Sequence, residues 1–367
     1  MAGSGHAMTW RGVKCWVSAT IAVVIHAAFM HGATAGEASK IHVAPLFTHI
    51  VDIPLGARTS RFDYGSLDAA AGRLYVAKMG SGKLLAFDTR AGKLAAELDG
   101  FPTVTGVLSV PPLHKVYASV PGAGLSVTIS MALGMVGLSQ GSGAVAILDA
   151  EDLHEIARLP GGVFPDGIAY DPKHQRVFVS DEQGGAVLVI DAVTDKLIAR
   201  IDVGGEVGNV QYDLATDKVY AAIQSRDDLA VIDPAAATLM LRYSLAGCAH
   251  PHGLAIAPNA AFGYVACDGN DRLLTVELAT GKVLNALPLG RDPDVMAIDA
   301  GTHRLYVAGE SGVLSSFDIA DPAKPDALGD VFVGPNAHAF AIDPASHRLF
   351  FPLGNVGGQS VLRVLAP

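Results

Sequence analysis

One short pattern occurs seven times along this chain, and this repetition limits the possible folds more than any other feature. Most copies read as Lys or Arg, then Leu or Val, then an aromatic residue, then small or β-branched residues. The copies begin at Arg73, Lys115, Arg176, Lys218, Phe262, Arg304 and Arg348. A short strand ending at a turn precedes each copy, a third strand follows it, and most copies have a fourth. Four short strands per unit, separated by turn residues, are typical of a β-propeller blade.

The two ends of the repeat array complement each other. The last copy stops after its third strand, at 361–366, whereas 46–56 reads like a fourth strand that has no unit of its own. We expect this N-terminal strand to complete the seventh blade, which closes the ring and removes an open sheet edge. The predicted fold class is therefore an all-β, seven-bladed β-propeller over residues 46–367.

The cycle of motifs within each repeat resembles that of a known family. Pro-x-Gly-x-Ala, then Leu-Tyr-Val-Ala, then Val-x-Val-Ile-Asp-x-x-Thr-x-Lys is similar to the YVTN-repeat propellers, especially the exported YncE-like proteins. The resemblance covers 46–367. It implies the propeller fold and a binding or interaction role, and some YncE-like propellers are associated with DNA binding. It implies little about activity, because propellers host unrelated functions.

The N-terminus has the pattern of a secretory signal peptide. Two basic residues are followed by an apolar run over 15–30 and by small residues that end at Ala35. We expect cleavage after Ala35, so that 1–35 is a signal peptide and 36–45 a linker. The mature protein is then periplasmic or secreted and has no transmembrane span. An uncleaved N-terminal anchor is the alternative.

The charge of the chain argues against a nucleic-acid partner. The formal net charge is −10, and it becomes more negative when the two basic residues of the leader are removed. Binding to phosphates needs a basic face, so the DNA binding of some YncE-like proteins is not expected here. A Gly-x-Ser-x-Gly sequence occurs at 137–141, but it lies in an uncharged apolar segment and not at a predicted strand-to-helix turn, the setting of a nucleophile elbow. No phosphate loop, zinc-finger spacing or Cys-x-x-Cys-His motif occurs. The sequence therefore leaves open whether the protein is an enzyme.

The loops before the first strands predict a polar channel mouth. The residue five positions before each first-strand end is Asp63, Thr105, Asp166, Gly208, His252, Asp294 or His338. A closed ring brings equivalent positions of all blades around one mouth of the central channel, and His250 adds a second imidazole beside His252. The candidate ligand-binding residues are Asp63, Asp166, His250, His252, Asp294 and His338. A small molecule or a cation is the expected ligand.

Four of these residues suggest a metal site. His252, Asp294, His338 and Asp63 come from blades five, six, seven and one, and two imidazoles with two carboxylates suit a divalent transition metal. In the other interpretation each side chain caps its own turn by accepting hydrogen bonds from loop N–H groups. The cofactor is therefore unknown from the sequence, with a divalent metal as the candidate.

An apolar insertion interrupts the second blade. The segment 121–142 lies between the second and third strands, and no charged residue occurs from Val116 to Leu148. We interpret it as a lid or as a docking surface for a protein partner. A disordered or locally packed excursion is the alternative.

Two cysteines remain after removal of the leader. Cys248 and Cys267 flank the first two strands of blade five. A disulfide between them requires Cα atoms within about 7 Å, and an exported protein can be oxidised. The sequence leaves open whether they are bonded.

The basic residues that begin most second strands predict ion pairs within each blade. In an antiparallel sheet they lie opposite the Asp that ends the third strand, so we expect Lys115 to pair with Asp149, Arg176 with Asp191 and Arg304 with Asp318.

Two functional hypotheses follow. The first is an exported binding or interaction protein that uses its acidic channel mouth. The second is a metal-dependent hydrolase of the lactonase type, in which a cation at the mouth polarises a carbonyl and activates water. A bound metal with an open coordination position would separate them.

Overall fold

The computed structural model describes residues 46–123, 141–258 and 261–367. The predicted signal peptide and linker lie outside these residues, as does 124–140, the larger part of the predicted apolar insertion. The lid or partner role predicted for that insertion stays a prediction.

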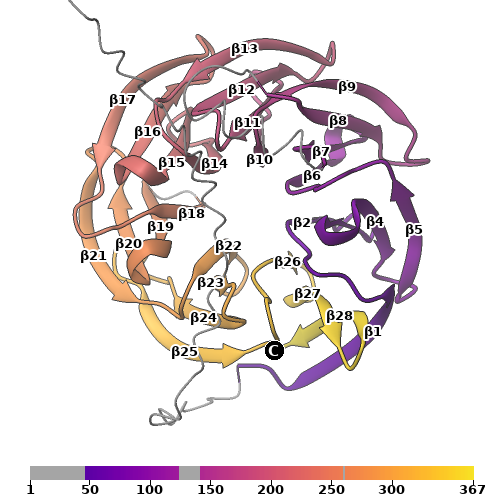
Figure 1. Cartoon of the computed structure of the whole chain (residues 1–367). Helices are drawn as coiled ribbons and strands as arrows, with labels where there is room; N and C mark the ends of the chain where they lie inside the picture. The colour runs from indigo at the N-terminus through magenta and orange to yellow at the C-terminus, as the bar shows by residue number, and fades with distance from the viewer. Residues whose placement is uncertain (1–45, 124–140, 259–260) are drawn as a thin grey trace, which may run out of the picture. The chain divides into compact units, whose positions relative to one another are not determined.

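The described chain forms seven four-stranded antiparallel sheets arranged as the blades of a propeller (Figure 1). Blade 1 contains β2 (Gly65–Asp68), β3 (Arg73–Lys78), β4 (Lys83–Asp88) and β5 (Lys93–Asp99). Blade 2 contains β6 (Val107–Val110), β7 (Lys115–Val120), β8 (Gly143–Asp149) and β9 (Glu155–Gly162). Blade 3 contains β10 (Pro165–Asp171), β11 (Arg176–Asp181), β12 (Ala186–Asp191) and β13 (Lys196–Asp202). Blade 4 contains β14 (Val207–Asp213), β15 (Lys218–Ile223), β16 (Asp228–Asp233) and β17 (Thr238–Ser244).

Blade 5 contains β18 (Pro251–Ile256), β19 (Phe262–Cys267), β20 (Arg272–Glu277) and β21 (Lys282–Pro288). Blade 6 contains β22 (Pro293–Asp299), β23 (Arg304–Gly309), β24 (Val313–Asp318) and β25 (Asp326–Phe332). Blade 7 contains β26 (Ala341–Asp343), β27 (Arg348–Val356), β28 (Gln359–Ala366) and the N-terminal β1 (His49–Ala57). Short 3-10 turns form at η1 (Met79–Ser81), η2 (Pro111–Leu113), η3 (Gln224–Arg226) and η4 (Asp268–Asn270). In the described residues, no helix has the length and apolar character needed to cross a membrane.

The N-terminal strand closes the ring, as predicted. β1 pairs antiparallel with β28, from His49 opposite Ala366 to Ala57 opposite Gln359. Figure 1 shows the indigo β1 beside the yellow β28. Arg363 of β28 also binds Asp52 of β1 through two hydrogen bonds of 2.7 and 2.6 Å. Strands from the two ends of the chain therefore form one blade.

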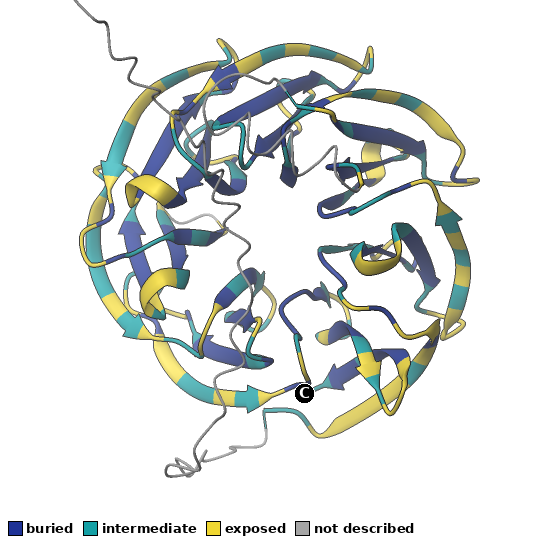
Figure 2. Ribbon diagram, in the orientation of Figure 1, coloured by how far each residue is buried: buried dark blue, intermediate teal, exposed yellow. Residues whose placement is uncertain are grey.

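Burial follows the position of each strand in its blade. The second and third strands are buried on both faces because each blade lies between two neighbours, so β11 and β12 are almost entirely buried. The outermost strands alternate between exposed and partly buried residues, as in β5, because one face meets solvent. Figure 2 shows this as dark blue inner strands and a banded outer rim.

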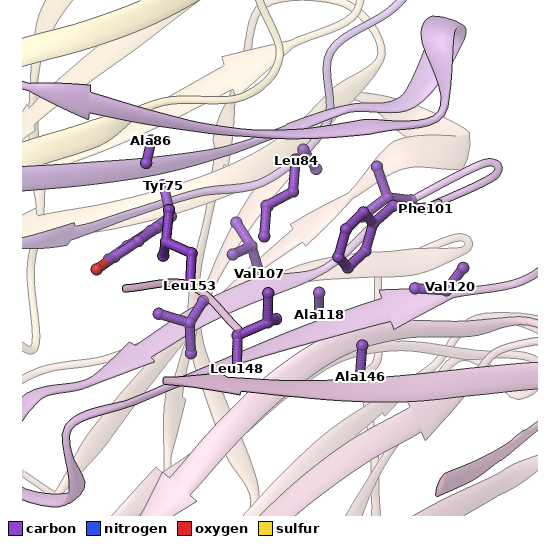
Figure 3. Close-up of a cluster of buried hydrophobic side chains, with 13 residues drawn as sticks. Tyr75, Leu84, Ala86, Phe101, Val107, Ala118, Val120, Ala146, Leu148 and Leu153 are labelled. Atoms are coloured by element: carbon purple, nitrogen blue, oxygen red, sulfur yellow. The ribbon is translucent and has the colours of Figure 1, made fainter. Parts of the chain in front are cut away.

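The hydrophobic core consists of layers between adjacent blades. In one such layer Tyr75 and Leu84 of blade 1 pack with Val107 and Leu148 of blade 2 (Figure 3). The Tyr75 hydroxyl donates to the backbone carbonyl of Ala150, at 3.0 Å. The aromatic position of the repeat thus fills the space between blades, and at this position its polar end also hydrogen bonds to the next blade.

The predicted ion pairs within blades are partly wrong. Arg304 does bind Asp318. Lys115 instead extends to blade 3, where its ammonium group lies 2.7 Å from a carboxylate oxygen of Asp195, and Arg176 donates to two backbone carbonyls in the turn after β16. These two long side chains therefore tie neighbouring blades together.

Candidate functional site

A pocket of about 490 Å³ lies at one mouth of the central channel. Its walls come from the loops before the first strands, as predicted, and from the loops between second and third strands. The lining residues are Arg61, Asp63, Tyr64, Met79, Thr105, Phe164, Asp166, Glu182, Gln224, His250, His252, Asp268, Asp292, Pro293, Asp294 and Glu310. Seven of them are carboxylates.

Irregular pairing at the start of the first strands places three of the predicted residues. The pairing of β10, β18 and β22 with their second strands shifts register around Asp166, His252 and Asp294 respectively. Such β-bulges bend the strand and re-aim a side chain. The same irregularity in successive blades thus brings these side chains to one pocket.

The structure brings all six predicted ligand-binding residues to this mouth. Asp63, Asp166, His250, His252 and Asp294 line the pocket. His338 lies directly behind the lining with its side chain 1 % exposed, and its Nε2 is 3.9 Å from Asp63 Oδ1 and 3.9 Å from Asp294 Oδ2.

Sequence analysis missed Arg61, which lies among the carboxylates of the mouth. Its guanidinium hydrogen bonds to Glu310 Oε1 and is 3.7 Å from Asp294 Oδ2 and 3.6 Å from Asp63 Oδ2. Arg61 precedes Asp63 by two residues, as His250 precedes His252. A comparison, across all repeats, of the residue two positions before the channel-mouth residue would have revealed Arg61.

His252 carries a positive charge in this arrangement. Its Nε2 is 3.0 Å from Asp294 Oδ1, and its Nδ1 is 3.1 Å from Gln224 Oε1. The Gln224 amide is oriented by its Nε2, which donates to Glu182 at 3.2 Å. Both ring nitrogens of His252 therefore face acceptors, so both carry hydrogens.

The pKa values of this pair agree with the hydrogen bonds. Burial acts to lower the pKa of His252, but Asp294 and the nearby Asp166 and Glu182 raise it to about 10. Burial likewise acts to raise the pKa of Asp294, but His252, His338 and Arg61 hold it well below its usual range. A buried imidazolium–carboxylate pair therefore forms one wall of the mouth.

The other carboxyl groups of the mouth are much less well neutralised. Burial raises the pKa of Asp63 well above its ordinary value despite the nearby Arg61, and burial also raises the pKa of Asp166. Burial and the neighbouring Asp166 raise the pKa of Glu182 to about 7. Groups of this kind gain stability when a positive charge comes close to them.

At the rim, His250 belongs to a second, more exposed cluster. Its Nδ1 is 3.2 Å from Asp268 Oδ2, and its Nε2 is 3.6 Å from Glu206 Oε2. Hydrogen bonds to these two carboxylates raise the pKa of His250 to about 9. His250 therefore adds a partly exposed positive charge to the edge of the mouth at neutral pH.

Tyr64, which sequence analysis also missed, forms the floor. Its hydroxyl donates to Asn209 Oδ1 at 2.8 Å, and it lies 3.4 Å from Asp166 Oδ2. Tyr64 lines both the mouth and a second cavity of about 300 Å³ further along the channel, where Val295 and Phe340 are among the apolar residues. The charged mouth thus ends where a part of the channel begins whose described lining residues carry no charge.

Two of the three cysteines of the chain are joined. A disulfide links Cys248 to Cys267, whose Cα atoms are 5.4 Å apart. It connects the loop that carries His250 and leads into β18 to the end of β19, directly before η4. The bond therefore restrains one side of the mouth.

Comparisons with known proteins identify the fold and nothing finer. No protein-family model matches the chain, and no curated protein matches it. A chain in a crystal structure of the mitotic checkpoint complex is similar over 92 % of this chain and 97 % of its own length, with a TM-score of 0.69 and 12 % identity. A chain of Kuenenia stuttgartiensis hydrazine synthase is similar over 90 % of this chain and 99 % of its own, with a TM-score of 0.68 and 14 % identity. The shared fold is the β-propeller, and a fold by itself does not identify a function.

Proposed function

We propose that this protein is an exported, YncE-like propeller of the YVTN-repeat kind that binds a positively charged ligand at its channel mouth. The observation that carries the proposal is the composition of the pocket. Its carboxylates are Asp63, Asp166, Glu182, Asp268, Asp292, Asp294 and Glu310, and among the described lining residues Arg61 is the single permanent cation.

The electrostatics of the mouth favour a cation over a neutral or anionic ligand. Carboxylates that surround a concave pocket with low-dielectric walls concentrate a negative potential in it. Arg61 makes its ion pairs with Asp63, Asp294 and Glu310, whereas burial and Asp166 raise the pKa of Glu182 to about 7. A bound cation would lower that pKa, so binding is expected to release protons near neutral pH.

The first prediction concerns spermidine, a soluble polycation that serves as a probe. The protein should bind it at pH 8, and Glu182→Gln should weaken binding about tenfold, the effect of about 1.4 kcal/mol. Lowering the pH to 5.5 should also weaken binding, because Glu182 then takes up a proton. Isothermal titration calorimetry measures both effects.

The matched control is Glu151→Gln, which removes a carboxylate from an exposed outer turn and should leave the affinity unchanged. Equal affinities for the Glu182→Gln variant and the unchanged protein would count against this pocket. Binding of neutral sugars or of anions in preference to spermidine would contradict the proposal.

Export is supported by two independent features. The N-terminal 35 residues have the pattern of a signal peptide, although they lie outside the described part of the chain. The Cys248–Cys267 disulfide is the kind of bond that persists in oxidising compartments. The resemblance to exported YncE-like proteins points in the same direction.

The second prediction follows from cleavage after Ala35. Protein recovered from the periplasm or the medium should begin at Gly36, and thiol titration after unfolding without reductant should find no free thiol. Intact-mass spectrometry and a thiol reagent measure these. One thiol would show that Cys15 and hence the leader remain, and two thiols in a cleaved chain would contradict the disulfide.

The lactonase-type hydrolase remains the alternative, and one observation favours it. Asp294, Glu310 and His338 offer ligand atoms that all lie within 4.8 Å of one another. A metal ion there could activate a water molecule for attack on an ester or lactone carbonyl. Hydrolysis that EDTA abolishes and added metal restores would move the assignment to this alternative.

A further inference from the structure

The starting point is the buried ring of His338. Its Nδ1 is 3.1 Å from the backbone carbonyl oxygen of Asn336, so Nδ1 carries the hydrogen and Nε2 carries a lone pair. No group among the described residues makes a hydrogen bond to His338 Nε2, and the side chain is 1 % exposed. A buried nitrogen of this kind requires a partner.

The Nε2 atom faces acceptors. Asp63 Oδ1 and Asp294 Oδ2 are each 3.9 Å away, too far for a hydrogen bond and well placed for a shared ion. Acceptor atoms this close to one buried imidazole nitrogen are stabilised when a positive charge lies among them.

The same place satisfies the requirements of a metal site. Ligand atoms of Asp294, Glu310 and His338 lie within 4.8 Å of one another. An imidazole nitrogen with carboxylate oxygens is a ligand set for Zn²⁺ or Mn²⁺. The hydrogen bond from Nδ1 to a backbone carbonyl is also the usual support for a metal-bound histidine, because it fixes the tautomer and the ring orientation.

The hydrogen bonds exclude His252 from the ligands and give it a positioning role. Both of its nitrogens face acceptors, as described above, so it has no lone pair to offer. It holds Asp294 through Oδ1 at 3.0 Å. The other oxygen of Asp294, Oδ2, is therefore directed toward His338 and Arg61.

In this structure Arg61 supplies the positive charge, but the geometry of its guanidinium group does not match that of the surrounding acceptors. Its hydrogen bond goes to Glu310, whereas the distances to Asp294 and Asp63 are 3.7 and 3.6 Å. Its Nε is buried and lacks a hydrogen-bond partner among the described residues. The side chain is 30 % exposed, so it has a path to solvent.

We propose that the channel mouth binds one divalent transition-metal ion through His338 Nε2, Asp294 and Glu310, with Asp63 beside them, and that Arg61 is the internal cation that the metal displaces. This inference rests on the proposed function, because it names the positively charged ligand. It also gives the site a built-in competitor, so that removing a positive charge at Arg61 strengthens metal binding.

The test is a titration of the purified protein with Zn²⁺, and with Mn²⁺ in parallel, against a chelating dye. The unchanged protein should bind one ion. Arg61→Gln should bind it about tenfold more tightly, since the competing charge is gone, and His338→Ala should lose binding both alone and in the Arg61→Gln background. Should His338→Ala fail to fold by its thermal melting curve, His338→Gln replaces it.

The matched control is His154→Ala. His154 lies with Asp149 and Asp152 in an exposed cluster that could also hold a metal ion. If His154→Ala still binds one ion, the ion lies at the mouth. If His154→Ala no longer binds an ion, the inference is overturned.

Two further results would overturn the inference. One is an affinity of Arg61→Gln equal to or weaker than that of the unchanged protein. The other is the absence of binding of either metal to Arg61→Gln. If Arg61→Gln binds neither metal but still binds spermidine, the proposed function stands. If it binds neither metal nor spermidine, the inference and the proposed function are both contradicted.

Discussion

A chain that lacks the N-terminal strand β1 should lose cooperative folding and associate through the exposed edge of blade 7. β1 pairs with β28 along its length, so its removal leaves the row of backbone donors and acceptors on β28 without partners. β1 also contributes to the contact between the last blade and the first. Leu55 is 1 % exposed and belongs to the cluster that contains Leu74 and Phe87 of blade 1 and Phe350 of blade 7.

The truncation should be compared with a chain that begins at residue 46 and keeps β1. Gel filtration and thermal unfolding should show a monomer with one sharp transition for the longer chain. The chain that begins at residue 58 should form oligomers or aggregates with a broad transition. A monomeric truncated chain with an unchanged melting temperature would show that β1 is dispensable.

Single substitutions give a graded form of the same experiment. Leu55→Ala should lower the free energy of unfolding by about 2–5 kcal/mol, the range for a buried leucine. Val51→Ala on the same strand should change it by less than about 0.5 kcal/mol, because Val51 is 54 % exposed. Urea denaturation measures both values, and equal effects would place the stabilising role of β1 elsewhere than in this side-chain packing.

The closure of the ring was predictable because it depends on counting strands. Every repeat supplies the same strands in the same order, so the incomplete seventh unit and the extra N-terminal strand could be matched before any contact was known. The alternation of buried and exposed residues in outer strands such as β5 then follows from the position of the strand in its blade.

Contacts between blades were not predictable in the same way. Sequence analysis paired Lys115 with Asp149 because the register within one sheet places them opposite each other, and the structure has that register. The long lysine side chain nevertheless binds Asp195 of the next blade. The distance to a neighbouring blade depends on the packing of two sheets, and a single repeat carries no information about it.

The candidate site shows the same division. Ring symmetry brings one position of each repeat to the mouth, so Asp63, Asp166 and His252 could be named from spacing alone. The charge states could not, because they depend on which side chains meet there. Arg61 lies beside Asp63 and Asp294, and the orientation of Gln224 makes His252 a donor through both nitrogens.

The free energy of unfolding should fall as the pH rises from about 7 to 10, because the folded protein holds a proton on His252. An unfolded histidine has a pKa near 6.5, whereas Asp294 and its neighbours raise the folded pKa of His252 to about 10 against the effect of burial. The stabilisation is therefore fully present below pH 6.5 and is lost as the pH rises through the folded value. Asp294 affects stability at the acid end of the pH range, because its pKa is held low. Its contribution to the free energy of unfolding is lost only in strong acid.

His252→Gln should remove most of this dependence. The variant leaves Asp294 without its buried cation, which should cost about 3–5 kcal/mol at pH 6.5, and the difference from the unchanged protein should shrink toward pH 10. Urea denaturation at several pH values measures the difference, in which contributions from Glu182 and His250 largely cancel. His303→Gln, a change in an exposed turn, should leave the pH profile intact. A difference between His252→Gln and the unchanged protein that stays constant from pH 6.5 to 10 would mean that His252 is neutral in the fold, and the pair with Asp294 would then be an ordinary hydrogen bond.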